Sequence, residues 1–115
     1  MKKIYLATPY STNADSVLRI ARFEAVNIVA AKLMSEGNLV FSPISHTHPI
    51  VLAGDLPTGW EFWKEYDRSF IEWADEVHVF KQDGWQISTG VTAEIKIANE
   101  MGKSVQYIAN HQKRY

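Results

Sequence analysis

The chain has 115 residues, of which 46% are hydrophobic and 22% charged, and its formal net charge is −1. These values predict one globular domain over residues 1–115 with a sizeable core. The charges are interleaved, so no basic patch indicates nucleic-acid binding, and no apolar run reaches the roughly 20 residues that span a bilayer. The absence of cysteine excludes disulfides, thiolate catalysis and cysteine-based zinc sites, and it fits a cytoplasmic protein.

Strand-like and helix-like segments alternate along the chain. In chain order, the pattern predicts a strand over 3–7, a helix from 15 or 16 to about 36, a strand over 38–41, a loop over roughly 43–59, a helix over 60–74, a strand over 76–80, a helix from 88 or 89 to 102, a strand over 104–108 and a polar tail over 110–115. This alternation favours a three-layer α/β domain of flavodoxin-like or Rossmann-like type, with a parallel sheet of four or five strands.

Glu94 is a charged residue on the core-facing side of its predicted helix. Val91, Ala98 and Met101 share its face at 3.6 residues per turn. A carboxylate on such an apolar stripe is costly unless the protein uses it. The helix follows the carboxyl end of a predicted strand, which is where open α/β sheets bind ligands.

Asp67 shows the same anomaly, because it lies between Trp63 and Ile71 on the apolar side of the helix predicted over 60–74. Two inward acids on consecutive helices are typical of sites that act at glycosidic bonds, where one carboxylate is a nucleophile and the other handles a proton. The alternative is that each acid is a boundary residue, capped or paired with a Lys or Arg.

Three segments resemble the nucleoside 2-deoxyribosyltransferase-like superfamily. They are 4–10, then Asp67 with Ile71 and 74–77, then Ser88, Gly90, Glu94 and Ala98 with 102–105. Within that superfamily the chain looks most similar to a small bacterial and phage domain family of unknown function, and is DUF1937-like. The resemblance covers nearly the whole chain and is more specific for the fold and site than for the substrate.

The resemblance implies three catalytic residues. Glu94 matches a nucleophile that attacks the anomeric carbon of a deoxyribose and forms a covalent glycosyl–enzyme intermediate. Tyr5 matches a tyrosine that orients this glutamate, although its position in a strand is also typical of an aromatic residue facing the core. Asp67 matches the acid that helps to protonate the departing base.

The resemblance also implies substrate contacts around the start of the last helix. Gly90 allows the backbone to approach the sugar, and Ser88 matches the position that distinguishes a 5′-phosphate from a free 5′-hydroxyl. A serine there favours a nucleoside 5′-monophosphate, with the helix amides adding to an anion site. Ser88 also fits the ordinary role of a helix N-cap, and the two roles are compatible.

The loop after the first strand departs from the superfamily pattern. Thr8 and Ser11 are expected to contact the substrate there, but the loop has neither the Gly nor the Arg of the nucleotide hydrolases. Arg19 or Arg22, early in the next helix, is the candidate to supply the missing cation.

Two further residues are candidates for substrate binding. His46 lies in the predicted 43–59 loop, and Trp85 can stack on a base or pack its own loop, as can Trp60. His46 and His48, with Asp55 nearby, are a weak candidate for a metal pair, and we expect no metal.

Together with the two inward acids, the resemblance implies an N-glycosidic bond hydrolase that acts on a (deoxy)ribonucleoside 5′-monophosphate without a cofactor. The alternatives are base exchange between nucleosides, disfavoured by the short C-terminal tail, and a nucleotide-binding sensor without turnover. The expected partner is a small nucleoside or nucleotide, with no nucleic acid and no membrane, and the resemblance implies a homo-oligomer.

Overall fold

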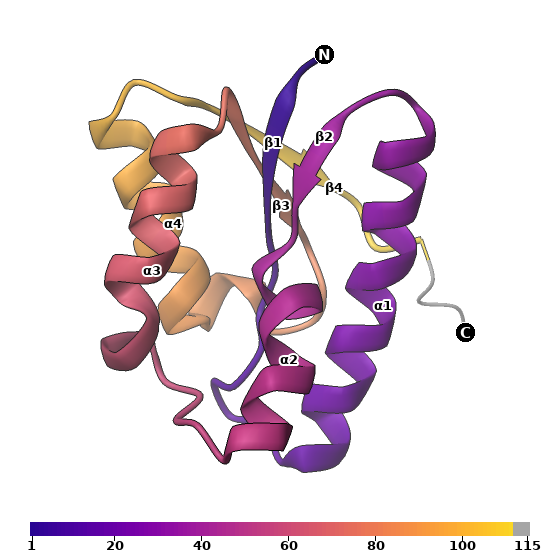
Figure 1. Ribbon diagram of the computed structural model, residues 1–115, viewed down its shortest axis with the longest axis vertical. Helices are drawn as coiled ribbons and strands as arrows, with labels where there is room; N and C mark the ends of the chain where they lie inside the picture. Colours follow the sequence, from indigo (N-terminus) through magenta and orange to yellow (C-terminus); the bar gives the residue numbers. More distant parts are fainter. Residues whose placement is uncertain (112–115) are drawn as a thin grey trace.

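A computed structural model describes residues 1–111 and has the expected α/β architecture (Figure 1). Its four strands are all parallel and follow the order β2-β1-β3-β4. They are β1 (Lys3–Ala7), β2 (Leu39–Phe41), β3 (Glu76–Phe80) and β4 (Ser104–Ile108). Because the strands are parallel, their carboxyl ends share one edge of the sheet, and the loops and helices that follow them meet there. The last four residues of the predicted polar tail lie outside the described part of the chain.

Helices cover both faces of the sheet, which confirms the three-layer fold of flavodoxin-like or Rossmann-like type. One face packs against α1 (Ser16–Ser35), and the other packs against α3 (Trp60–Trp73) and α4 (Thr89–Glu100) (Figure 1). Successive residues of a strand point to opposite faces, so Tyr5 faces the α3 and α4 side while Leu6 packs with α1. No helix in residues 1–111 combines the length and the hydropathy needed to cross a bilayer.

The predicted helix ends are confirmed where polar caps or glycine mark them. Asp15 accepts a hydrogen bond from the Leu18 amide at 2.9 Å at the start of α1, and Ser88 accepts one from the Val91 amide at 3.2 Å at the start of α4. Gly37 follows α1 with a φ of 95°, a left-handed conformation that favours glycine.

The loop predicted over roughly 43–59 is wrong, because most of it forms a helix, α2 (Pro43–Gly54), at the carboxyl edge of the sheet (Figure 1). Pro43 occupies the first turn, where its missing N–H costs nothing. Pro49 lies inside the helix and removes one backbone hydrogen bond, but the helix continues to Asp55, which caps it in a left-handed conformation. The high content of Pro and Gly in this region therefore indicated a loop where tertiary packing supports a helix.

Candidate active site

Tyr5, Asp67 and Glu94 come together between the sheet and the helices α3 and α4. The Tyr5 hydroxyl donates a hydrogen bond to Glu94 Oε2, across 89 positions of sequence. All three side chains are buried, with 0% of Tyr5, 8% of Asp67 and 5% of Glu94 exposed. The convergence follows from side-chain direction, since Tyr5 faces the two helices whose inner faces carry the acids.

The electrostatics of this acidic cluster, which we define as Tyr5, Asp67 and Glu94, disfavour negative charge. Burial raises the pKa of Glu94 well above its usual range, the charge of Asp67 raises it further, and the hydrogen bond from Tyr5 opposes both effects. Burial likewise raises the pKa of Asp67 to about 7, against a smaller opposing effect of Tyr5. Burial and then the two carboxyls raise the pKa of Tyr5, so this hydroxyl remains a donor. Both carboxyls therefore keep their protons to higher pH than ordinary carboxyls do.

A narrow cavity of about 60 Å³ opens onto Asp67 and Glu94. Its walls come from the loop after β1, from α2, from the start of α3 and from the start of α4. The residues that line it are Thr8, Tyr10, Ser11, Thr12, Pro43, Ile44, Thr47, Val51, Thr58, Gly59, Trp60, Trp63, Asp67, Ser88, Thr89, Gly90 and Glu94. Tyr5 lies behind Glu94 and is outside this lining.

The start of α4 forms one wall of the cavity, and both residues expected there to contact the substrate, Ser88 and Gly90, line it. Ser88 is 2% exposed, and its oxygen accepts the Val91 amide, which leaves its hydroxyl hydrogen available as a donor. The Thr89 amide is also engaged, because it donates to Thr12 Oγ1 at 3.1 Å. Ser88 is therefore an N-cap that also lines the cavity.

The loop after β1 lies at the centre of the cavity wall, and both predicted residues from it, Thr8 and Ser11, line the cavity. Ser11 Oγ donates to the Thr58 carbonyl at 3.0 Å, which joins this loop to the segment before α3. The Tyr10 hydroxyl and His48 Nδ1 lie 2.5 Å apart, which joins the same loop to α2.

Neither arginine of α1 lines the cavity. Arg22 is 5% exposed and donates to the backbone carbonyls of Tyr10, Thr12 and Asp83. Arg19 donates to the Ala14 carbonyl at 3.1 Å. Among residues 1–111, no Lys or Arg lines the cavity, whereas two carboxyls and several hydroxyls do.

The structure does not bring His46 or Trp85 to the cavity. The Trp85 ring packs against Tyr107, with the ring centroids 5.6 Å apart, and His46 lies 5.9 Å from the ring of Phe41. His48 is buried against Tyr10. Within the described residues, no group of three His, Cys, Asp or Glu side chains is arranged to hold a metal ion.

Several lining residues had no predicted role. Trp63 lines the cavity, and its Nε1 donates to the Pro57 carbonyl at 2.8 Å, which holds the indole at the mouth. Its spacing from Asp67, four residues along the same helix, was a signal that could have identified it. Thr47 lines the cavity from α2, which the prediction of a loop concealed.

One comparison with known proteins gives a match. Residues 2–110 match the family described as a domain of unknown function, DUF1937. No curated protein matches the chain. The family match covers all the residues of the acidic cluster and of the cavity.

Proposed function

We propose that this protein, which belongs to the DUF1937 family, cleaves the N-glycosidic bond of a nucleoside or nucleoside 5′-monophosphate. The same proposal includes a relation to the nucleoside 2-deoxyribosyltransferase-like superfamily, which the three sequence segments support. The observation that carries it is the convergence of two buried acids and a tyrosine at the end of one narrow cavity. Buried acids with raised pKa values are costly to folding and are typical of functional sites.

The proposed first step uses both acids. A Glu94 oxygen forms a bond to C1′ while the bond from C1′ to the base nitrogen breaks, and Asp67 gives its proton to the departing base. A pKa of about 7 suits Asp67 to this role, because a general acid works best when its pKa is near the operating pH. Positive charge that develops on the sugar favours ionised Glu94, so the transition state offsets the electrostatic cost present in the empty site.

The second step releases the sugar. Water attacks C1′ and gives a proton to Asp67, now a carboxylate, while the bond from C1′ to Glu94 breaks. Two displacements at C1′ retain its configuration. If a second free base replaced water, the same intermediate would complete base exchange, which is the alternative reaction.

The 5′ group of the substrate has two candidates, each favoured by one observation. Ser88 lines the cavity with a free hydroxyl hydrogen, which favours a 5′-phosphate as the acceptor. The lining contains two carboxyls and, within residues 1–111, no Lys or Arg, which favours an uncharged 5′-hydroxyl. A phosphate dianion without a cation would also be repelled by ionised Glu94.

The test is a panel of ribo- and deoxyribonucleosides and their 5′-monophosphates, with free base followed by chromatography. Release by the wild type and none by E94Q is expected, and mass spectrometry of a quenched reaction should show a sugar adduct on Glu94. Adding a second free base separates exchange from hydrolysis. Binding of a nucleotide with no release from any substrate would contradict the proposal and favour a nucleotide sensor.

A further inference from the structure

Arg22 connects two loops that follow the two central strands. Its Nη1 donates to the carbonyls of Tyr10 and Thr12, at 3.0 and 3.2 Å, in the loop after β1. Its Nη2 donates to the Asp83 carbonyl at 3.1 Å, in the loop after β3. Burial lowers the pKa of Arg22, and the charge of Asp83 opposes this effect. A single guanidinium therefore holds the backbone of two loops that are far apart in sequence, and Arg22 itself lies 61 positions from Asp83.

Gln82 and Gly84 complete this junction. Gln82 Nε2 donates to Thr8 Oγ1 at 2.8 Å and to the Arg22 carbonyl at 3.0 Å, which ties the same two loops a second time. Gly84 has a φ of 91°, and a Cβ at this position would lie 2.9 Å from Arg22 Nη2. Both its conformation and the closeness of the guanidinium therefore require glycine.

One side of the cavity is formed by the loop after β1 and by the start of α4, into which the loop after β3 leads. Thr12 receives the Thr89 amide, so the loop after β1 lies directly against the start of α4. Both segments line the cavity, while Arg22 does not, so its guanidinium lies behind the wall.

Stability alone does not account for an arginine at this position. Arg22 Nε is buried and has no hydrogen-bond partner in the described part of the chain. An unpaired buried donor costs about 1–3 kcal/mol, and a buried charge adds to that cost. The feature that an arginine alone supplies is a rigid fork whose two terminal nitrogens reach both loops at once.

We propose that Arg22 is a positioning residue that sets the spacing between the loop after β1 and the start of α4, and thereby the fit of the substrate's sugar and 5′ group. The functional part of this inference rests on the proposed glycosidase activity. Glu94 and Asp67 are held by Tyr5 and by their own helices, independently of Arg22. Losing the fork therefore weakens substrate binding more than it slows the chemical step.

Hydrogen–deuterium exchange tests the positioning without any substrate. In R22K, exchange in peptides covering 8–14 and 82–90 is expected to rise about tenfold or more together, while peptides from α3 remain as in the wild type. An exposed arginine of α3 gives the matched control, R68K, which should change neither loop. Wild-type exchange rates in both loops of R22K, or a uniform rise in exchange throughout the chain, would overturn the inference.

A second variant keeps Arg22 itself. G84A displaces the guanidinium through the added Cβ, and it should raise exchange in the distant 8–14 peptide as R22K does. An 8–14 peptide that exchanges as in the wild type would count against the fork as the link between the loops.

Kinetics then test the consequence for the site. For the best substrate of the wild type, R22K should raise KM about tenfold while kcat stays within about threefold, and R68K should change neither. A fall in kcat at constant KM would overturn the positioning role. If the wild type releases no base from any substrate, the proposed function fails, while the exchange data still decide whether Arg22 holds the two loops.

Discussion

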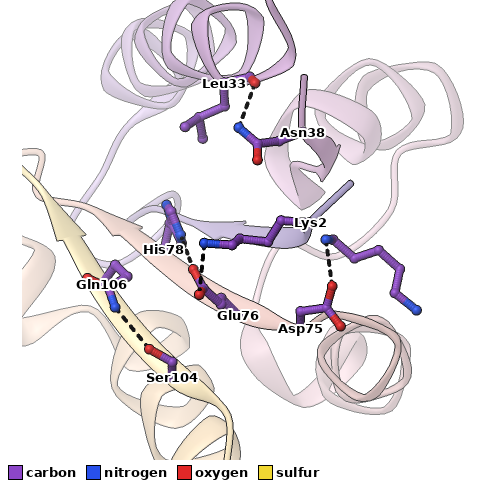
Figure 2. A network of polar contacts seen from close by, with 9 residues as sticks. Lys2, Leu33, Asn38, Asp75, Glu76, His78, Ser104 and Gln106 are labelled. Atoms are coloured by element: carbon purple, nitrogen blue, oxygen red, sulfur yellow. Dashed lines mark hydrogen bonds and ion pairs between the residues drawn. The ribbon is translucent and has the colours of Figure 1, made fainter. Parts of the chain in front are cut away.

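Two groups of residues on opposite faces of the sheet shift the pKa values of their carboxyls in opposite directions. On the α1 side, Lys2 Nζ forms an ion pair with Glu76 at 3.1 Å, and His78 Nε2 lies within hydrogen-bond distance of the same carboxylate at 2.9 Å (Figure 2). The hydrogen bond from His78, and then that from Lys2, lower the pKa of Glu76 despite partial burial. We call these three residues the ion-pair network.

On the α3 and α4 side, no Lys, Arg or His among residues 1–111 forms an ion pair with the carboxyls of the acidic cluster. Burial raises the pKa of both carboxyls, the charge of Asp67 raises that of Glu94 further, and the hydrogen bond from Tyr5 opposes these effects. The ionised forms of these two carboxyls are therefore electrostatically unfavourable, in contrast to that of Glu76. The comparison indicates that burial without a cationic partner raises the pKa of a carboxyl, whereas partial burial beside Lys2 and His78 leaves that of Glu76 lowered.

The largest expected effect is the loss of activity in E94Q. Removing a nucleophile should lower kcat by roughly 10³-fold or more, measured as base release, because the amide cannot form the glycosyl ester. The melting temperature should stay level or rise, since the neutral amide avoids the cost of keeping a buried carboxyl protonated. Wild-type turnover in E94Q would contradict the assignment of the nucleophile.

D67N should lower kcat by about 10²–10³-fold, because the departing base loses its proton donor. The same substitution also tests the raised pKa of Asp67. Asp67 titrates near 7 in the folded protein and near 4 when unfolded, so its ionisation costs stability as the pH rises between these values.

D67N removes that cost, so it should be more stable than the wild type by on the order of 2 kcal/mol at pH 8 and nearly equal to it at pH 4. Urea denaturation at both pH values measures this difference. Equal stability at pH 8 would show that Asp67 is not held in an unfavourable charge state.

Y5F should have a smaller effect, about a 10–100-fold loss in kcat, because Glu94 keeps its place but loses the hydrogen bond that orients it. Without this donor the pKa of Glu94 should rise further, so the acid limb of the pH–rate profile should move to higher pH. An acid limb at the wild-type position would argue that Tyr5 is only a packed core residue.

E76Q is the control from the ion-pair network and should leave kcat and KM within about twofold of the wild type. Its lowered pKa means that Glu76 contributes stability above about pH 4.5, and this contribution is lost as the pH falls through the folded-state pKa. Because the pair is screened by solvent, the expected cost at pH 7 is under about 1 kcal/mol in a urea melt. A tenfold loss of activity would break the contrast between the two groups.

The sequence contained enough information for the fold and the acids, because both are local patterns. Glu94 and Asp67 stand out through helical periodicity, which needs no knowledge of distant contacts. The role of Tyr5 came from the resemblance, because a tyrosine in a strand looks the same whether or not its hydroxyl meets an acid. The buried hydrogen bond to Glu94 now places it in the acidic cluster.

Other features depend on which loops lie side by side, and the sequence alone does not contain that information. The contacts of Thr12 with Thr89 and of Arg22 with Asp83 span 77 and 61 positions. Trp85 was placed at the cavity from its type and its loop, whereas Tyr107 of β4 provides the surface against which it packs. The helix α2 was not predicted because its segment is rich in Pro and Gly, residues that are typical of loops. Tertiary contacts stabilise the helix despite this composition.

The helical structure of α2 affects how substitutions can change the width of the cavity. Ile44, Thr47 and Val51 line it from α2 at intervals of three and four residues, so they form one row on a regular backbone. Exchanging any of them for a larger or smaller side chain alters the width of the cavity while the loops around Glu94 keep their hydrogen bonds. If the proposed function holds, the range of bases that fit the cavity can therefore be adjusted one position at a time, separately from Glu94 and Asp67.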